Sequence, residues 1–364
     1  MTIGIDITPL LFQGSGVADY TYNLVKNLLL IDKKNQYKLL FTSPRINKSF
    51  PFLEEFKKMG AKIYRYPLPF VFFQICWEKL DVVPVEWLIG PIDVFYASDF
   101  LRPPSTVRTV TTVHDLIWKI HPGYHEDFIV KTHDKKLSKT IQYRDTVVVD
   151  SQTTKNDLLK YFPRVNQKKI HVIYPGIGEE FKPPDQRPKR SLSDKPYILY
   201  VGAIEPRKNL LTAIEVFREL IKDKYFSDFE FLIAGMAGWR KNQVTDEVKN
   251  LRLEGRVKFL GYVKDQDLPG LYSKAKLTVY LSSYEGFGLP PLESLACGTP
   301  VLAGDNSSMK ETIDRQFLVD VFDKKEVLKK MKFLLKSAAV VDSLKVREKF
   351  SWHSAAEQLL RLWQ

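Results

Sequence analysis

The sequence predicts an α/β protein of two domains, each built around a parallel β-sheet. The chain has 364 residues, which is more than one hydrophobic core usually organises. In both halves, short β-branched runs alternate with amphipathic segments, the pattern of a parallel sheet covered by helices on both faces. A proline-rich polar stretch separates these halves.

The first half begins with a strand, a glycine turn and a helix. Residues 2–8 (TIGIDIT) form a β-branched run, and residues 17–32 repeat apolar side chains at helical spacing after a turn that contains Gly14 and Gly16. Five further strand-like runs follow, separated by segments that suit helices or loops. They are residues 37–43, 61–67, 93–98, 109–115 and 146–151.

The boundary between the domains is expected in residues 182–196. This stretch contains four prolines and almost no apolar side chain, which is typical of an exposed linker. We therefore expect an N-terminal domain over residues 1–181 and a C-terminal domain over residues 182–349. In the second domain, strands are expected at 197–203, 229–235, 257–263, 277–283 and 300–305, and helices at 210–221, 267–275 and 290–298.

Composition and charge narrow the class of protein. The net charge is +12 and the pI is near 9.3, so the surface attracts anions such as phosphorylated ligands. The basic residues are spread along the chain without a nucleic-acid-binding motif, and we expect no nucleic-acid partner. The two cysteines, Cys76 and Cys297, are too few for a disulfide framework or a metal cage.

No segment of the sequence suggests a membrane span or a signal peptide. The most apolar stretch, residues 66–77, contains prolines and falls well short of the ~20 residues that cross a bilayer as a helix. The first nine residues include Asp6 and fit a strand better than a signal peptide. We therefore expect a cytoplasmic protein.

A glycine turn between two glutamates is the first candidate for chemistry. Glu285 precedes the turn 286–288, and Glu293 lies inside a helix expected to begin near Pro290. Glycines let backbone amides approach a ligand closely, and a helix N-terminus favours an anion such as a diphosphate. Paired glutamates at this spacing are more often surface charges, so this observation alone leaves both interpretations open.

Together with its neighbours, this stretch resembles the E-x7-E motif of the retaining glycosyltransferases of family four. The resemblance extends over nearly the whole chain and is closest to the bacterial O-antigen mannosyltransferases. It implies the GT-B fold, in which two Rossmann-like α/β domains have parallel sheets facing across a central cleft. It also implies that the C-terminal helix, residues 350–364, packs back on the N-terminal domain. The matching segments are residues 112–116, 169–177, 200–210, 231–240, 257–275, 284–303 and 306–313.

The resemblance implies roles for five side chains. Glu285 resembles the carboxylate that reaches the hydroxyls of the donor sugar, and Glu293 resembles the one that accepts hydrogen bonds from the ribose. Arg207 and Lys208 match the basic pair that binds the diphosphate and neutralises its charge as it leaves. His114 follows a predicted strand, and a lone histidine at such a position is usually structural. The resemblance implies instead that His114 matches the family's histidine that contacts the donor sugar.

Backbone positions complete the expected donor site. Residues near the phosphates or the base of the donor would be Gly202, Val263, Gly286, Phe287, Gly288 and Leu289. The turn Gly14, Ser15 and Gly16 resembles the one whose amides face the diphosphate and the acceptor. Here the sequence departs from the family, because residues 17–19 (VAD) stand where a glycine and an arginine are common. The departure leaves acceptor binding open.

Two further patterns are given structural interpretations. Residues 265–267 (DQD) resemble a D-x-D metal motif, but they lie just before a predicted helix, where an aspartate accepts hydrogen bonds from free backbone amides. Gly235 and Gly238 are assigned to turn geometry, and Trp239 to packing or a ligand contact. The histidines other than His114 lack metal-binding spacing; they are His121, His125, His133, His171 and His353.

The resemblance implies sugar transfer with retention of the anomeric configuration, without a metal or a cofactor. The expected donor is a nucleotide diphosphate sugar, with GDP-mannose favoured and rhamnose or glucose as alternative sugars. The expected acceptor is a glycan or a lipid-linked saccharide in the synthesis of a cell-surface polysaccharide.

Three alternatives stay open. Residues 64–87, rich in aromatic and basic side chains, either dock on the inner leaflet of the cell membrane or pack internally as helices. The chain could be a catalytically impaired nucleotide-sugar-binding partner subunit, an idea supported only by residues 17–19. An epimerase or phosphorylase of the same fold would explain the architecture but not the assembled motifs.

Overall fold

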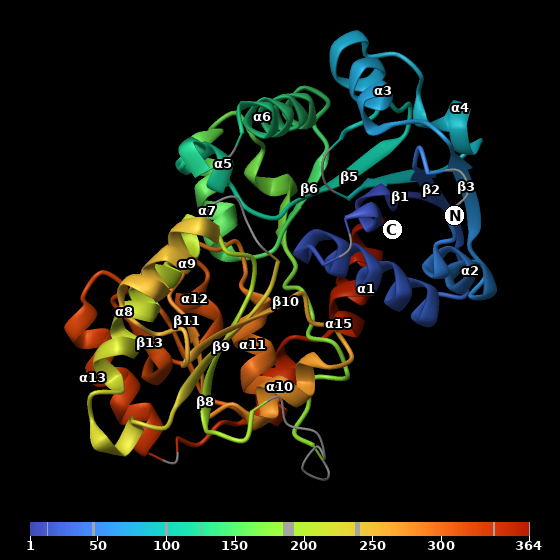
Figure 1. Ribbon diagram of the computed structural model, residues 1–364. Helices are drawn as coiled ribbons and strands as arrows, with labels where there is room; N and C mark the ends of the chain where they lie inside the picture. Colours follow the sequence, from blue (N-terminus) through green and yellow to red (C-terminus); the bar gives the residue numbers. More distant parts are fainter. Residues whose placement is uncertain are drawn as a thin grey trace. The chain divides into compact units, whose positions relative to one another are not determined.

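A computed structural model describes residues 1–12, 14–45, 48–98, 101–124, 126–184, 193–236, 241–337 and 339–363. The chain forms two compact units (Figure 1). Unit 1 comprises Met1–Gly176 and Ser351–Gln364, and unit 2 comprises Ile177–Phe350. Each unit is built on its own parallel sheet, which confirms the predicted fold class.

The sheet of unit 1 has seven parallel strands in the order β3-β2-β1-β4-β5-β6-β7. Its strands are largely buried on both faces, as the β-branched runs predicted. The strand order reverses between β1 and β4, which is where doubly wound sheets commonly bind ligands. The strands are β1 Thr2–Asp6, β2 Gln36–Thr42, β3 Lys62–Tyr66, β4 Val94–Ala97, β5 Arg108–Val113, β6 Thr146–Val149 and β7 Ile170–Val172.

Helices cover both faces of this sheet (Figure 1). The α-helices are α1 Gly16–Ile31, α2 Pro51–Lys58, α3 Phe70–Gln74, α4 Val85–Ile89, α5 Ile117–Ile120, α6 Asp127–Gln142, α7 Gln152–Tyr161 and α15 Trp352–Trp363. Shorter turns of helix are η1 Thr8–Leu11, the π-helix η2 Ile75–Leu80, η3 Pro122–Tyr124 and η4 Gln167–Lys169.

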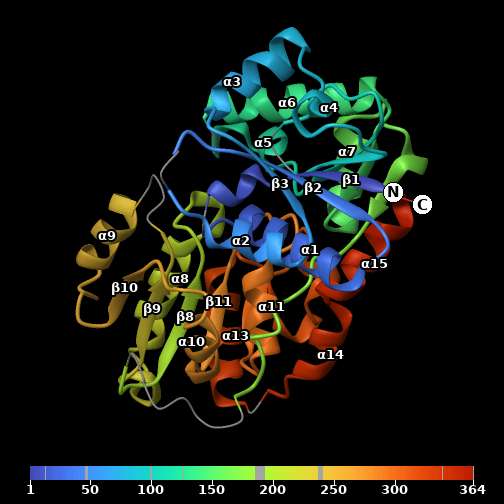
Figure 2. The same cartoon turned by 90° about the vertical axis from the view of Figure 1, so that its right-hand side faces the viewer.

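The C-terminal helix α15 lies side by side with α1 (Figures 1 and 2). Trp352 and Trp363, at the two ends of α15, are buried in the same core as Leu24 and Leu28 of α1. The apolar spacing of residues 350–364 therefore has its explanation in unit 1, whose core it completes.

The sheet of unit 2 has six parallel strands in the order β10-β9-β8-β11-β12-β13. Here the order reverses between β8 and β11. The strands are β8 Tyr197–Val201, β9 Glu230–Ala234, β10 Val257–Gly261, β11 Leu277–Tyr280, β12 Val301–Gly304 and β13 Leu318–Val319. The helices are η5 Pro206–Lys208, α8 Leu210–Leu220, η6 Lys224–Phe226, α9 Lys241–Asn250, α10 Leu268–Lys274, α11 Leu289–Ala296, α12 Met309–Thr312, η7 Arg315–Phe317, α13 Lys324–Lys336 and α14 Ser343–Lys349.

Unit 2 begins at Ile177, before the expected linker. The N–H of Ile177 donates to the carbonyl of Phe350 at 3.0 Å, and Phe181 is buried with its ring 6.0 Å from that of Tyr272. Much of the proline-rich stretch, residues 185–192, lies outside the described residues. Within the described part of the chain, no helix is long and apolar enough to cross a bilayer.

Candidate functional site

Two basic side chains that follow β8 meet one carboxylate that follows β11. The guanidinium Nη1 of Arg207 lies 2.6 Å from Oε2 of Glu285, and Nζ of Lys208 lies 2.8 Å from its Oε1. The hydroxyl of Tyr280, the last residue of β11, donates to the same Oε1 at 2.8 Å. Because β8 and β11 flank the reversal of strand order, this cluster occupies the position where such sheets bind ligands.

Burial and charge together set the ionisation of this cluster. Glu285 and Lys208 are 6% and 8% exposed. Burial alone would raise the pKa of Glu285, but attraction to Arg207 and Lys208 outweighs it and holds that pKa well below its usual range. Burial lowers the pKa of Lys208. With both cations charged, the trio carries a net charge of about +1, which the partly exposed carboxylate of Glu205, 2.9 Å from Nε of Arg207, offsets. The two cations are the groups that an anionic ligand would bind.

The loop after β12 holds Glu285 in place. The N–H of Glu285 donates to the hydroxyl of Ser307 at 2.9 Å, and the hydroxyl of Ser308 donates to the carbonyl of Glu285 at 2.9 Å. Ser308 also bonds the carbonyl of Phe287 at 3.0 Å. Two serines of the segment 306–313 thus fix the backbone of the glycine turn.

The second glutamate of the motif, Glu293, lies on α11 and is anchored separately. Its Oε2 accepts a hydrogen bond of 2.9 Å from the hydroxyl of Tyr272, a fully buried residue of α10. Gly288 caps α11 at its N-terminus with φ +87°, and prolines occupy the first turn of the helix. A Cβ at Gly288 would lie 2.1 Å from Cε of Met309, so a side chain there would force this buried methionine to move, and the positive φ disfavours one in any case.

The other backbone candidates lie at the carboxyl ends of the same sheet. Gly202 follows β8, Gly235 follows β9, and Val263, which is half-buried, lies two residues after β10. The N–H of Gly202 donates to the carbonyl of Ala234, and the N–H of Gly235 donates to that of Gly261. Leu289 begins α11. These loops therefore contact one another through backbone atoms at the carboxyl ends of the strands.

Replacing Gly235 by alanine should destabilise unit 2. Its φ of +150° is rarely adopted by L-residues, and a Cβ there would lie 2.0 Å from the carbonyl oxygen of Gly202. We expect a loss of roughly 2–4 kcal/mol and a fall in Tm of roughly 5–10 °C, measured by thermal unfolding. Gly255→Ala is the matched control, because a Cβ at Gly255 meets nothing within 4 Å. An equal fall in both variants would contradict the steric argument.

In unit 1, His114 follows β5 and is held by a carboxylate that follows β6. Its Nδ1 lies 2.7 Å from Oδ2 of Asp150, and the ring of Tyr20 on α1 meets it edge-on at 4.6 Å between centroids. A carboxylate at Nδ1 favours the tautomer that carries its proton there. His114 is thus fixed in orientation by two side chains. Asp115 accepts from the N–H of Ile117 and so shapes the following turn.

The turn after β1 starts helix α1. Gly14 has φ +80°, and the hydroxyl of Ser15, the N-cap, accepts from the N–H of Ala18 at 3.3 Å. Gly16 is the first residue of α1, and Asp19 lies in its first turn. A carboxylate there interacts favourably with the helix dipole, which gives Asp19 a structural role and places negative charge beside the turn.

The D-x-D segment is not a helix cap of the expected kind. Asp267 is the N-cap residue of α10, yet its side chain makes no capping hydrogen bond. That expectation was wrong for Asp267; Pro269, the second residue of the helix, has no N–H, which removes one of the two amides that such a cap would use. In the part of the chain that the structure describes, no three His, Cys, Asp or Glu side chains are grouped as metal ligands. His125, Gly238 and Trp239 lie outside the described residues.

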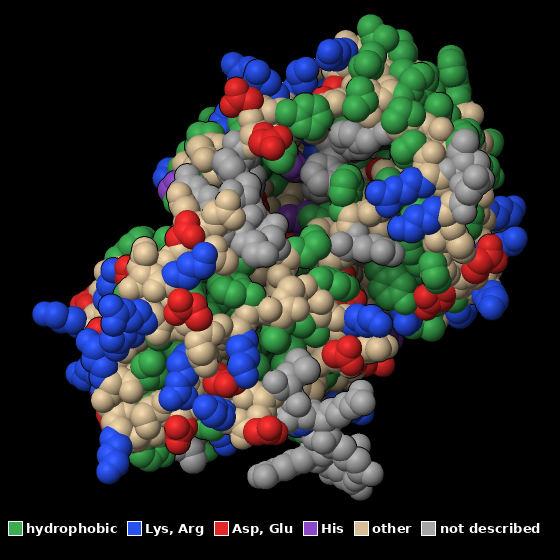
Figure 3. Space-filling model, viewed as in Figure 1, with side chains coloured by type: hydrophobic (Ala, Val, Ile, Leu, Met, Phe, Trp, Pro, Cys, Tyr) green, Lys and Arg blue, Asp and Glu red, His purple; other side chains and the backbone are tan. Residues whose placement is uncertain are grey.

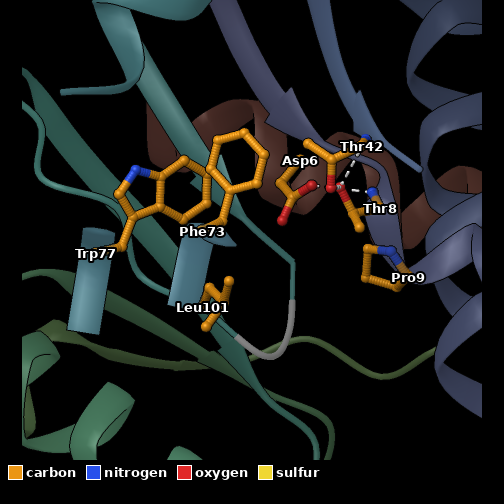
Figure 4. Close-up of a pocket in the computed structure, with 7 residues that line it drawn as sticks. All are labelled: Asp6, Thr8, Pro9, Thr42, Phe73, Trp77 and Leu101. Atoms are coloured by element: carbon orange, nitrogen blue, oxygen red, sulfur yellow. Dashed lines mark hydrogen bonds between the residues drawn. The ribbon is translucent and has the colours of Figure 1, made fainter. Parts of the chain in front are cut away.

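The segment 64–87 divides its apolar side chains between the interior and the surface. Phe73 and Trp77 are buried and border a cavity of about 10 Å³, enough for about one water, together with Asp6, Thr8, Pro9, Thr42 and Leu101 (Figure 4). Other large apolar side chains of the segment are exposed, and Figure 3 shows hydrophobic side chains gathering over α3 and α4. They are Val71, Phe72, Ile75, Leu80, Val82 and Trp87, called the apolar patch below.

Sequence reasoning missed three side chains that hold the candidates in place. They are Tyr280, Tyr272 and Asp150. A weak signal existed for Asp150, because an aspartate directly after a buried strand-like run lies at the same sheet edge as His114. The two tyrosines end or follow apolar runs and could not be told from core residues.

Comparison with known proteins identifies the class. The family model "Glycosyltransferase Family 4" matches residues 35–181, and "Glycosyl transferases group 1" matches residues 181–352. Together they cover residues 35–352, most of the chain. The chain is therefore a glycosyltransferase and belongs to family four.

Individual relatives agree with this class. O-antigen chain mannosyltransferase B of Escherichia coli is 26% identical over 380 residues, covering 98% of this chain and 97% of that protein. O-antigen chain mannosyltransferase RfbU of Salmonella typhimurium is 35% identical over 206 residues, covering 56% of this chain and 53% of that protein. The solved structure of Anabaena HepE in complex with UDP and glucose has a TM-score of 0.75 at 15% identity, covering 99% and 98% of the two chains. The fold is GT-B.

Proposed function

We propose that this glycosyltransferase moves mannose from GDP-mannose to a saccharide acceptor in the synthesis of a cell-surface polysaccharide, with retention and without a metal. The observation that supports a nucleotide diphosphate donor is the cluster of Arg207, Lys208 and Glu285 at the strand-order reversal of unit 2. Mannose is favoured because both O-antigen relatives described above are mannosyltransferases. HepE, by contrast, was solved with UDP and glucose, so other donors belong in any test.

In the proposed reaction, the bond between the sugar's anomeric carbon and the diphosphate oxygen breaks, and the acceptor oxygen bonds that carbon on the same face. The acceptor's proton passes to the leaving phosphate. Arg207 and Lys208 stabilise the charge that grows on the diphosphate. Glu285 accepts hydrogen bonds from the sugar, Glu293 accepts them from the ribose, and His114 contacts the transferred sugar.

The glycine loops would supply the remaining contacts to the donor. Gly202, Gly286, Phe287, Gly288 and Leu289 offer backbone that a phosphate can approach closely. For Val263 we propose a backbone contact with the base. Gly14, Ser15 and Gly16 are proposed to face the acceptor, where the carboxylate of Asp19 disfavours an acceptor that bears a phosphate at that point.

The test is a screen of guanosine, uridine and thymidine diphosphate sugars for slow hydrolysis by the purified protein, with and without chelator. We expect hydrolysis of GDP-mannose that chelator leaves unchanged and that Glu285→Gln removes. If the protein hydrolyses another donor faster, that donor replaces GDP-mannose in the proposal. Inhibition by chelator would contradict the metal-free reaction. Bound nucleotide without turnover, even with saccharide acceptors present, would favour the impaired partner subunit instead.

We further propose that the apolar patch rests on an anionic bilayer, where a lipid-linked acceptor would lie. Trp87 is 77% exposed and Leu80 61%, and burying such side chains in the interface is favourable. Burial raises the pKa of Glu78, in the same segment, to about 7. Its negative charge is therefore partly lost near neutral pH, which reduces repulsion from anionic lipid.

The double substitution Phe72→Ser with Trp87→Ser should weaken sedimentation with anionic vesicles at low salt by about tenfold or more, since each aromatic side chain contributes roughly 1.5–3 kcal/mol when buried. The matched control is Phe322→Ser with Phe333→Ser, which removes two exposed phenylalanines of unit 2. Equal vesicle binding by wild type and the patch variant would rule out this docking surface.

A further inference from the structure

A cavity of about 180 Å³ lies in unit 1 at the amino ends of β6 and β7. Asp145, in its wall, directly precedes β6, whereas Asp150, the partner of His114, directly follows that strand. At about 3.3 Å per residue, the two edges are about 16 Å apart. The cavity is therefore separate from the His114 site. Its polar lining residues are Thr140, Arg144, Asp145, Arg164, Asn166 and Lys169.

The charges around this cavity are unbalanced. Arg144, Arg164 and Lys169 form no ion pair with any carboxylate in the described parts of the chain. The one acidic lining residue, Asp145, is already bound at both oxygens by buried Arg102, at 2.8 and 2.9 Å. Nζ of Lys169 donates to the backbone carbonyl of Arg144, which places its ammonium group beside that residue. Arg144 and Arg164 are exposed, so water and salt weaken the repulsion among these cations, and an anion bound between them would remove it further.

The cavity wall also contains a buried hydroxyl that has no hydrogen-bond partner among the described residues. Thr140, near the end of α6, is 1% exposed, and its Oγ1 has no hydrogen-bond partner among the residues that the structure describes. A buried hydroxyl without a partner costs stability, so such groups usually serve a ligand, a water or an ion. The amide oxygen of Asn166 accepts from the N–H of Lys168 at 3.0 Å, which leaves its NH2 group as a donor. The lining thus offers mainly donors.

We propose that this cavity binds the phosphate group of a small ligand. Two guanidinium groups, an ammonium, a hydroxyl and an amide are the donors that a tetrahedral oxyanion accepts from. The volume of about 180 Å³ is below the ~300 Å³ of the smallest typical ligand pockets. It therefore suits a phosphate with a short organic part, such as glycerol phosphate, and not a nucleotide sugar. The phosphate comes either from a soluble ester or from a lipid headgroup.

The first measurement is calorimetric titration of the full chain with inorganic phosphate and with glycerol 3-phosphate, at ionic strength matched with chloride. We expect saturable binding, weakened on the order of tenfold or more by Arg144→Asn with Arg164→Gln. Asparagine suits position 144 because Arg144 has φ +54°. Lys131→Gln with Lys160→Gln removes the same charge from exposed positions of unit 1 and should leave binding unchanged.

Thr140→Val separates a ligand-binding role from a structural one. It should weaken phosphate binding several-fold while leaving Tm unchanged or higher, because it removes a buried hydroxyl that has no partner in the described structure. A fall in Tm with unchanged phosphate binding would instead count against the assignment of Thr140 to the ligand.

A second arm sediments the same proteins with phosphatidylglycerol vesicles. If the Arg144/Arg164 variant binds less phosphate than the charge-matched control but sediments equally with vesicles, the ligand is a soluble ester. If it binds phosphate equally but sediments less with vesicles, the ligand is a lipid headgroup. Identical behaviour of these two variants in both arms overturns the proposal. Because neither arm measures sugar transfer, donor hydrolysis by these variants tests the proposed function separately, and we expect it unchanged.

Discussion

Glu285→Gln should reduce donor turnover by about a thousandfold while nucleotide diphosphate binding stays the same or tightens. The glutamine keeps the shape but removes the only negative charge from a trio with two cations. Lost stabilisation of the reacting sugar raises the activation free energy of the chemical step by roughly 4 kcal/mol. The cluster then has one negative charge fewer and attracts the diphosphate more strongly. Steady-state hydrolysis and GDP titration measure the two effects.

The matched control is Glu205→Gln. Glu205 lies 2.9 Å from Nε of Arg207 but is about one-third exposed, so its removal should change turnover by only a few-fold. The Glu285 variant should also lose roughly 3 kcal/mol of stability, because buried Lys208 then loses the carboxylate at 2.8 Å and Arg207 keeps the partly exposed Glu205. Weaker GDP binding by a folded Glu285→Gln protein would contradict the proposed division of roles.

Asp150→Asn should lower turnover by about a hundredfold with little change in donor affinity. The carboxylate at 2.7 Å fixes which ring nitrogen of His114 carries the proton, whereas an amide can pair with either tautomer. The populations of the two tautomers should then change, and the nitrogen chemical shifts of the imidazole ring report them directly. A merely structural Asp150 would alter stability without moving those shifts.

Asp115→Asn provides the comparison for that variant. Asp115 adjoins His114 but accepts from the N–H of Ile117, a bond that asparagine can also make. We expect turnover within about twofold of wild type. Equal losses in the Asp115 and Asp150 variants would show that any charge change near the turn, and not the tautomer of His114, sets the rate.

Sequence patterns predicted the sheets well because their strands are buried on both faces. Runs such as residues 146–151 and 277–283 are continuous and β-branched, and both contain the expected strands β6 and β11. The shortest strands were missed: β7 has three residues and β13 two. Elements so short leave no periodicity to detect.

The candidate site was only partly predictable, for a different reason. Motif residues such as Glu285 and Arg207 stand out by type and by resemblance, but their mutual pairing depends on strand order. Nothing local to position 207 indicates that it lies beside position 285, because β8 and β11 become neighbours only through the reversal of the sheet. The same holds for Asp150 and His114, which meet because β5 and β6 are adjacent.

The route of the chain also bears on the order in which the units fold during synthesis. Unit 2 is inserted into unit 1, since Ile177–Phe350 lies between the two segments of unit 1. A ribosome that has released residue 350 has delivered all of unit 2, while the core of unit 1 still lacks Trp352 and Trp363. During synthesis, the apolar face of α1 that packs on α15 therefore stays without this partner until after all of unit 2 has been made. Exposed apolar surface of this kind favours aggregation, so unit 1 is the more vulnerable of the two units while the chain is incomplete.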